Sequence, residues 1–147
     1  MEFELISFND SRSIINSILD YEPLENYELT PNEIFCVIEE TGIILQGKQI
    51  PNWNDFEFGK IEITIDEIIE ITKIKLETED PIIIISDECF KDQKAYKIPT
   101  NKLKEFAERT YPKLYNMDLI QPFDLIFIQP STKLISMIHH EGILMEY

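Results

Sequence analysis

The stretch Pro81-Ile-Ile-Ile-Ile-Ser86 decides the fold class. Its β-branched side chains suit a strand, because they lose rotational freedom in a helix and pack well on a pleated surface. Successive residues of a strand point to opposite faces of the sheet, so a strand that is apolar throughout must be covered on both faces. The stretch therefore predicts a central strand with other elements packed on both of its sides.

The whole chain shares this preference for β-structure. It has 27 isoleucines, 12 leucines and only two alanines, which favours strands over helices. Its 147 residues suit one domain, and its 44% apolar and 28% charged fractions are ordinary for a globular protein. We expect one globular domain over residues 1–147.

Further strands are predicted where apolar residues alternate or form short runs. These segments are FELISF (3–8), IFCVIE (34–39), IILQG (43–47), KIEITI (60–65), KAYKIP (94–99), DLIFIQ (124–129), KLISMIHH (133–140) and ILMEY (143–147). Short connections that end in Gly42 and Gly142 predict two hairpins, because glycine adopts a positive φ without strain.

Two helices are predicted from apolar residues at helical spacing. The first follows Asn9 or Asp10 as its cap and must end before Pro23. The second follows Thr100 or Asn101, and Pro112 is expected to end or kink it.

Residues 64–76 fit two structures. Thr64 and Glu67 have the spacing of a helix capping box, while the isoleucines after them also alternate like strand residues, and composition favours the strand. The sum is an α+β domain with a mainly antiparallel, twisted sheet of five to eight strands and two or three helices.

Charge restricts the choice of partners. The net charge of −15 repels nucleic-acid phosphates and anionic membranes and attracts basic proteins. Residues 1–40 carry ten acids and one base, whereas residues 91–113 carry seven bases and three acids. No apolar run approaches the roughly 18 residues that span a bilayer, and the N-terminus lacks a signal-peptide pattern. We expect a cytoplasmic protein that binds neither nucleic acid nor membrane.

The sequence offers little chemistry for catalysis. The only histidines, His139 and His140, are neighbours on a predicted strand, so their rings should point to opposite faces and not share an ion. Cys36 and Cys89 fit reduced, buried thiols. Phosphate-binding glycine loops and spaced metal motifs are absent. We therefore expect no catalytic residue, no metal and no cofactor.

Two segments combine acidic and aromatic residues, a pattern that favours protein binding because rings supply contact area and carboxylates pair with Arg or Lys. The alternative is a solvated loop at 21–33 and aromatic side chains that hold 52–58 to the core. The predicted partner-binding residues are Glu22, Glu25, Tyr27, Glu28, Glu33, Trp53, Asp55 and Glu57.

In size, acidity, α+β pattern and absence of catalytic motifs, the chain resembles the immunity proteins of bacterial polymorphic and contact-dependent toxin systems. The resemblance implies a cognate toxin domain as partner, one-to-one binding and a cytoplasmic location. A nuclease is a suitable toxin, because carboxylates can occupy the positive cleft that handles phosphates.

Two other functions remain open. One is a phage-type inhibitor that imitates DNA, although the basic residues of 91–113 interrupt such a surface. The other is a small enzyme that uses His139 or His140 with a nearby carboxylate for proton transfer.

Overall fold

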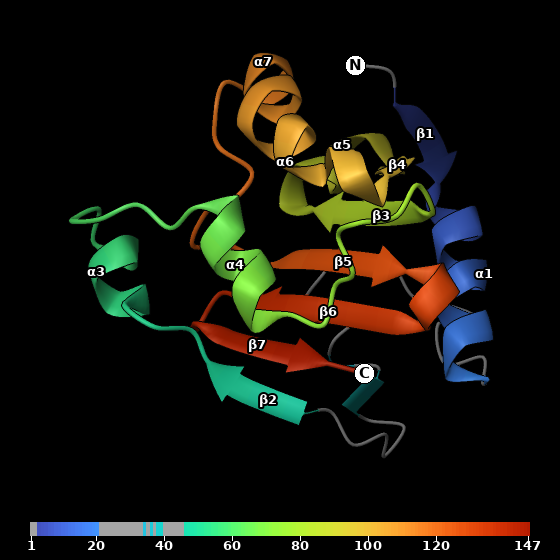
Figure 1. Ribbon diagram of the computed structural model, residues 1–147, viewed down its shortest axis with the longest axis horizontal. Coiled ribbons are helices and arrows are strands. Elements are labelled where there is room, and N and C mark those ends of the chain that lie inside the picture. Colours follow the sequence, from blue (N-terminus) through green and yellow to red (C-terminus); the bar gives the residue numbers. More distant parts are fainter. Residues whose placement is uncertain (1–2, 21–33, 35, 37, 40–45) are drawn as a thin grey trace.

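The computed structural model describes residues 3–20, 34, 36, 38–39 and 46–147. They form a single seven-stranded sheet in the order β1-β4-β3-β5-β6-β7-β2, with every neighbouring pair antiparallel (Figure 1). The α+β class and the antiparallel sheet predicted from sequence are confirmed. PIIIIS is β3, flanked on both sides by other strands.

The strands are β1 (Glu4–Ser7), β2 (Gln46–Gln49), β3 (Pro81–Ser86), β4 (Lys94–Pro99), β5 (Leu125–Gln129), β6 (Leu134–His139) and β7 (Ile143–Glu146). The helices are α1 (Phe8–Leu19), α3 (Trp53–Glu57), α4 (Ile65–Ile71), α5 (Asp87–Asp92), α6 (Leu103–Glu105) and α7 (Tyr111–Tyr115), with a π-helical segment, Phe106–Thr110, joining the last two. The short helices α3 and α5 were not expected, so the count exceeds the two or three predicted.

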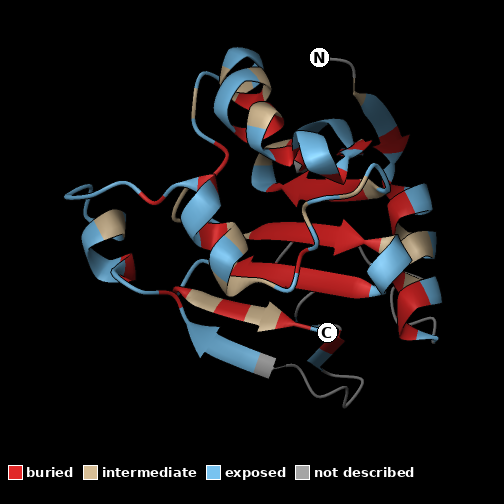
Figure 2. Cartoon of the chain, viewed as in Figure 1, coloured by how far each residue is buried: buried red, intermediate tan, exposed pale blue. Residues whose placement is uncertain are grey.

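Three neighbouring strands form the core of the sheet. Residues 82–86 of β3, all of β5 and residues 134–138 of β6 are buried (Figure 2). Their side chains alternate between the two faces, so both faces are covered, as the continuous apolar run predicts. Full burial of one isoleucine stabilises the fold by about 1.5–3 kcal/mol, which makes these strands the main source of stability.

One sheet face can be followed across five strands through direct strand partners. Tyr96 pairs with Ile84, Ile84 with Phe127, Phe127 with Ser136, and Ser136 with Glu146. At one end of this row, Tyr96 contacts the ring of Phe106, from the π-helical segment between α6 and α7. The other end lies under the chain that leaves α4. The chain that leaves α4 and the π-helical segment between α6 and α7 therefore cover the same face of the sheet.

The chain between α4 and β3 crosses this face and is held there by buried polar side chains. Gln129 accepts a hydrogen bond from the Lys75 amide at 3.1 Å and donates one to the Lys75 carbonyl at 2.8 Å. Glu146 accepts from the Lys73 amide at 2.8 Å. Gln129 and Glu146 are almost fully buried, and these bonds satisfy their side chains together with the backbone of the crossing segment.

Residues 64–76 are a helix followed by this crossing segment, so the strand favoured by composition is wrong. The Thr64 side chain accepts from the Glu67 amide, and the Glu67 carboxylate accepts from the Thr64 amide, which completes the capping box. These local bonds start α4 and turn Ile65 and Ile68 inward. KIEITI is likewise no strand, because its last residues are the cap and first turn of α4.

The hairpin predicted around residues 40–42 is also wrong. The described residues 34, 36, 38 and 39 are helical, and β2 pairs with β7 instead. Ile34 and Ile38 are fully buried, at the i, i+4 spacing of one helix face. Over so short a run, the apolar positions of IFCVIE fit both the two-residue period of a strand and the 3.6-residue period of a helix. Tertiary packing selected the helix.

The first predicted helix is α1, but its cap is Ser7, whose side chain accepts from the Asp10 amide. Pro112 does not end the second helix. The π-helical segment lies just before Pro112, and in it the Tyr111 amide donates to the Phe106 carbonyl. The helix then continues through Pro112 to Tyr115. Proline has no amide hydrogen and clashes with the preceding turn, so a wider turn before it accommodates the ring.

Within the part of the chain that the structure describes, no helix has the length and apolar character needed to cross a membrane.

Replacing Gln129 with Leu should destabilise the protein by roughly 2–4 kcal/mol, because the Lys75 amide and carbonyl would both lose their partner. Urea unfolding monitored by circular dichroism measures this change. An unchanged midpoint would mean that water replaces the side chain at no cost.

Gly142, in the β6–β7 turn, has a φ of +87°. A Cβ atom at this position would lie 2.5 Å from Cγ of Trp53, whose ring covers the turn. Gly59 has a φ of +75° with open space around it, and Gly47 has only ordinary contacts near 3.7 Å. A side chain would therefore meet both steric conflict and backbone strain at position 142, strain alone at position 59, and neither at position 47.

Gly142→Ala should lower stability by more than about 2 kcal/mol, since strain and displacement of Trp53 add. Gly59→Ala should cost about 1 kcal/mol from strain alone. Gly47→Ala should cost nothing, or stabilise the protein by up to about 1 kcal/mol. Equal losses in all three variants, measured by thermal unfolding, would contradict this order.

Candidate functional site

Residues 55–70, which run from α3 through the connection to α4, form an acidic surface. Six carboxylates occur there with a single lysine, and all six are exposed. Asp66 pairs with Lys104 at 2.7 Å, and Glu67 caps α4. The surface keeps a strong negative potential from its other four acids: Asp55, Glu57, Glu62 and Glu70.

Two large apolar side chains are exposed on this acidic surface. Phe58 has 76% of its surface exposed and Ile61 has 39%. Phe58 is held outward by the end of α3: Gly59 adopts a positive φ, and the Lys60 amide bonds to the Asp55 carbonyl at 2.8 Å. Aromatic rings, including Phe, are enriched in the cores of protein interfaces.

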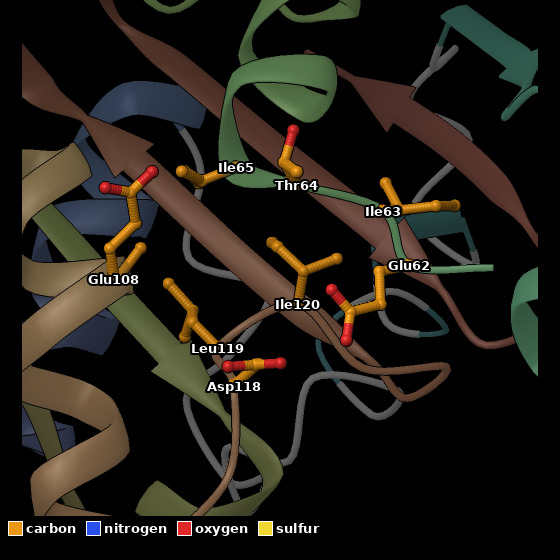
Figure 3. Close-up of a pocket in the computed structure, with 9 residues that line it drawn as sticks. Glu62, Ile63, Thr64, Ile65, Glu108, Asp118, Leu119 and Ile120 are labelled. Atoms are coloured by element: carbon orange, nitrogen blue, oxygen red, sulfur yellow. The ribbon is translucent and has the colours of Figure 1, made fainter. Parts of the chain in front are cut away.

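Two pockets flank residues 61–63. One, of about 180 Å³, lies between residues 62–65 and the helical segment that contains Glu108, with residues 118–120 completing its wall (Figure 3). The other, of about 280 Å³, lies between residues 50–52 and α4. Both contain Glu62 at the rim and the buried Ile63.

The first pocket combines charge with apolar surface. Glu62, Glu108 and Asp118 supply three carboxylates, while isoleucine and leucine side chains supply the apolar part. Glu108 lies 3.9 Å from Lys104, and among the described residues Glu62 and Asp118 make no ion pair. Such a pocket suits an Arg or Lys side chain, whose stem is apolar and whose end is charged.

The structure divides the predicted partner-binding residues into three groups. Asp55 and Glu57 are exposed within the acidic surface. Trp53 is only 2% exposed, so its expected role as a surface anchor is wrong. Glu22, Glu25, Tyr27, Glu28 and Glu33 lie outside the described residues.

Of the aromatic residues of 52–58, Trp53 is buried and Phe58 is the most exposed. Trp53 packs against Phe56 with ring centroids 5.2 Å apart and covers the Gly142 turn, whereas Phe58 is exposed. The spacing holds a signal, because residues 53 and 56 lie three apart on one face of a short helix and residue 58 does not. This helix was not predicted, so the signal was missed.

A second polar site lies at one end of the sheet. Ser86 pairs with Leu125, and Leu125 with Ile138, so the next residue on each strand falls at the same sheet end. Those residues are Asp87, Asp124 and His139. Antiparallel register thus gathers side chains that lie up to 52 positions apart in the sequence.

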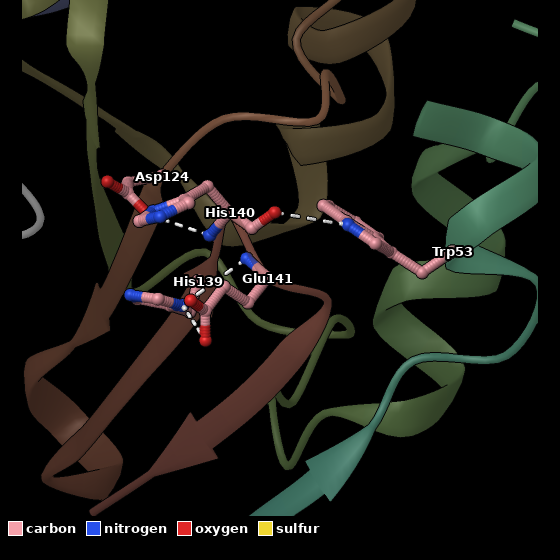
Figure 4. A network of polar contacts seen from close by, with 5 residues as sticks. All are labelled: Trp53, Asp124, His139, His140 and Glu141. Atoms are coloured by element: carbon pink, nitrogen blue, oxygen red, sulfur yellow. Dashed lines mark hydrogen bonds and ion pairs between the residues drawn. The ribbon is translucent and has the colours of Figure 1, made fainter. Parts of the chain in front are cut away.

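The two histidine rings lie side by side, contrary to the expectation that they point apart. Their centroids are 4.1 Å apart with an interplanar angle of 35°. β6 ends at His139, and His140 belongs to the turn, so strand alternation does not reach it. One carboxylate oxygen of Asp124 accepts from the His140 amide at 2.8 Å and lies 3.0 Å from Nδ1 of its ring (Figure 4).

Trp53 fixes the same turn from its other side. Its Nε1 donates a hydrogen bond to the His140 carbonyl at 3.2 Å (Figure 4). His139 accepts a bond at Nδ1 from the Glu141 amide at 3.3 Å. Partial burial of Asp87, together with the charge of Asp124, raises the pKa of the Asp87 carboxyl. The negative groups at this end of the sheet therefore lie close enough to repel one another.

Cys89 has no features of a nucleophile. It is buried, its Sγ accepts from the Ser86 amide at 3.4 Å, and burial raises the pKa of its thiol. The neighbouring Tyr111 hydroxyl lies 3.0 Å from Ser86 Oγ, and burial raises the pKa of Tyr111 to about 12. Reactive cysteines are exposed and have a lowered pKa, so the structure does not support Cys89 as a nucleophile.

Both cysteines are free thiols, as expected, but Cys36 is exposed and not buried.

In the native protein, only one thiol should react rapidly with a chromogenic disulfide reagent. Cys36→Ser should abolish the fast reaction, and the remaining thiol should react only after unfolding, because Cys89 is buried. Rapid reaction of the Cys36→Ser protein would show that Cys89 is accessible and would make it a candidate nucleophile.

Comparison of the chain with protein-family models, curated proteins and solved structures gave no match.

Proposed function

We propose that the protein binds and neutralises a basic protein partner through the acidic surface of residues 55–70. The observation that carries this proposal is Phe58, a 76% exposed ring at the end of α3 and within a run of carboxylates. Burial of such a ring in a partner supplies a large share of binding energy, while the charges around it select a positive surface.

The carboxylate pocket gives the interface a second contact. An Arg or Lys side chain of the partner would place its stem against the apolar wall and its charge between Glu62 and Asp118. Charge-assisted bonds to Arg are stronger than neutral ones and fix orientation. Phe58 and the pocket residue Glu62 are four positions apart in the chain, and the proposed interface includes both.

Electrostatics also favours rapid capture. A net charge of −15 attracts a basic protein over about a Debye length, and association is faster at low salt. Glu22, Glu25, Tyr27, Glu28 and Glu33 remain predicted contacts that would extend the surface.

The resemblance to immunity proteins suggests the partner's class, a bacterial toxin domain such as a nuclease. Inhibition then follows from occlusion: carboxylates occupy the positive cleft that the toxin uses for phosphates. An acidic inhibitor of this kind requires neither a cofactor nor a catalytic residue of its own.

The test begins with capture of a partner from lysate of the source cell on immobilised protein at low salt. The captured protein should be basic, and the purified pair should bind one to one. Phe58→Ala should weaken binding by roughly 30-fold, the loss of a hot-spot residue. Glu62→Lys should slow association and reduce its salt dependence.

Asp92→Lys is the matched control, because Asp92 is exposed on α5, outside the acidic surface. It makes the same charge change as Glu62→Lys and should leave dissociation unaltered. Equal binding by the wild type, Phe58→Ala and Glu62→Lys would refute the surface. A captured partner whose activity persists at saturating protein would refute neutralisation.

A further inference from the structure

We propose that Asp124, His139 and His140 bind a divalent transition-metal ion of the zinc type. Each residue offers one ligand atom, and the three atoms lie within 4.8 Å of one another. The site is at the sheet end where β5 begins and β6 finishes, in the network of Figure 4. It is independent of the proposed partner surface.

The donor set selects the class of ion. Two imidazole nitrogens with one carboxylate oxygen suit Zn²⁺, Ni²⁺ or Cu²⁺, whereas Mg²⁺ and Ca²⁺ prefer oxygen ligands alone. Zinc bonds of 2.0–2.1 Å place tetrahedral donors about 3.4 Å apart. Ligand atoms at the full 4.8 Å separation would therefore need to close by about 1.4 Å, a distance that side-chain rotation can supply.

The turn holds the ligands close before any ion arrives. Asp124 is bonded to the His140 amide, and Trp53 is bonded to the His140 carbonyl, so the backbone of His140 is fixed from both sides. His139 is fixed by β6, where it pairs with Ile143. Binding then orders few additional groups, which favours affinity.

The surroundings are negative and partly open. The side chains of Asp124 and His139 are only 12% and 14% exposed, while that of His140 is 49% exposed. The Glu141 carboxylate lies 4.0 Å from Nδ1 of His139 and adds negative charge beside the three ligands. The exposed side of His140 leaves a path by which an ion enters and water completes the coordination shell.

Asp124 also holds the turn, so its replacement would mix loss of a ligand with loss of stability. His140 gives the cleaner test, because its main-chain bonds to Asp124 and Trp53 do not depend on its ring. Glu70, an exposed carboxylate of α4, provides a control for nonspecific attraction of cations to an acidic protein.

The experiment titrates ZnCl₂ into chelator-treated protein by calorimetry in a large excess of Mg²⁺, with thermal unfolding measured in parallel. Zinc should bind one to one, raise the melting temperature, and lose this effect when EDTA is added. His140→Gln should weaken binding by about tenfold or more, and His139→Gln with His140→Gln should abolish it. Glu70→Gln should stay within about twofold of the wild type.

Bound Co²⁺ gives a second measurement, because its visible absorption reports nitrogen and oxygen ligands directly. That absorption should appear in the wild type and in Phe58→Ala, and disappear in His140→Gln. Equal zinc affinity of wild type and His140→Gln would overturn the site, as would complete competition by Mg²⁺. Because Phe58→Ala keeps the metal ligands, failure of partner binding and failure of metal binding are distinguishable.

Discussion

Burial of three neighbouring strands on both faces is the constraint on which the rest of the structure depends. β3, β5 and β6 are mostly apolar on both faces, so each face requires a cover. On the face that carries Tyr96 and Gln129, that cover consists of α4, the crossing segment that follows it and the helical chain from α6 to α7. The crossing segment brings backbone amides and carbonyls into an apolar layer, and Gln129 and Glu146 satisfy them there.

This cover shapes the acidic surface, and α3 shapes the histidine site. α4 sits over the sheet, and the chain that enters it must turn at Gly59, which exposes Phe58 beside a run of acids. The pocket with Glu62 and Asp118 lies between the start of α4 and the helical segment that contains Glu108. At the sheet end, Trp53 of α3 holds the turn that contains His140. Packing requirements therefore place the acidic surface and the histidines.

The strands could be read from sequence where one pattern dominates. PIIIIS and DLIFIQ have no helical period, and both are strands as predicted. KIEITI alternates between apolar and polar residues as a strand does. However, Thr64 and Glu67 form a capping box, and its two hydrogen bonds start a helix at Ile65, the last residue of this segment. IFCVIE fits the strand period and the helix period equally, and burial of Ile34 and Ile38 on one helix face favours the helix. Local bonds and tertiary packing thus overrode composition.

The candidate sites were less predictable for a geometric reason. Alternation correctly describes β6 as far as His139, but the position of the strand end decides where His140 points, and strand ends are poorly encoded in sequence. Asp124 joins the histidines through the register of β5 and β6, which no local pattern reveals. Likewise, the exposure of Phe58 and the burial of Trp53 follow from a five-residue helix, too short for periodicity to identify.

The sheet's two borders have a consequence for self-association. β1 and β2 are each only four residues long, and β2 reads Gln-Gly-Lys-Gln, with Lys48 exposed. A border this short, polar and charged is a poor template for docking of another chain. The isoleucine-rich segments that would stack most readily into cross-β fibrils are enclosed between such borders. Damage that detaches β2 would uncover β7, and aggregation would then begin from that side.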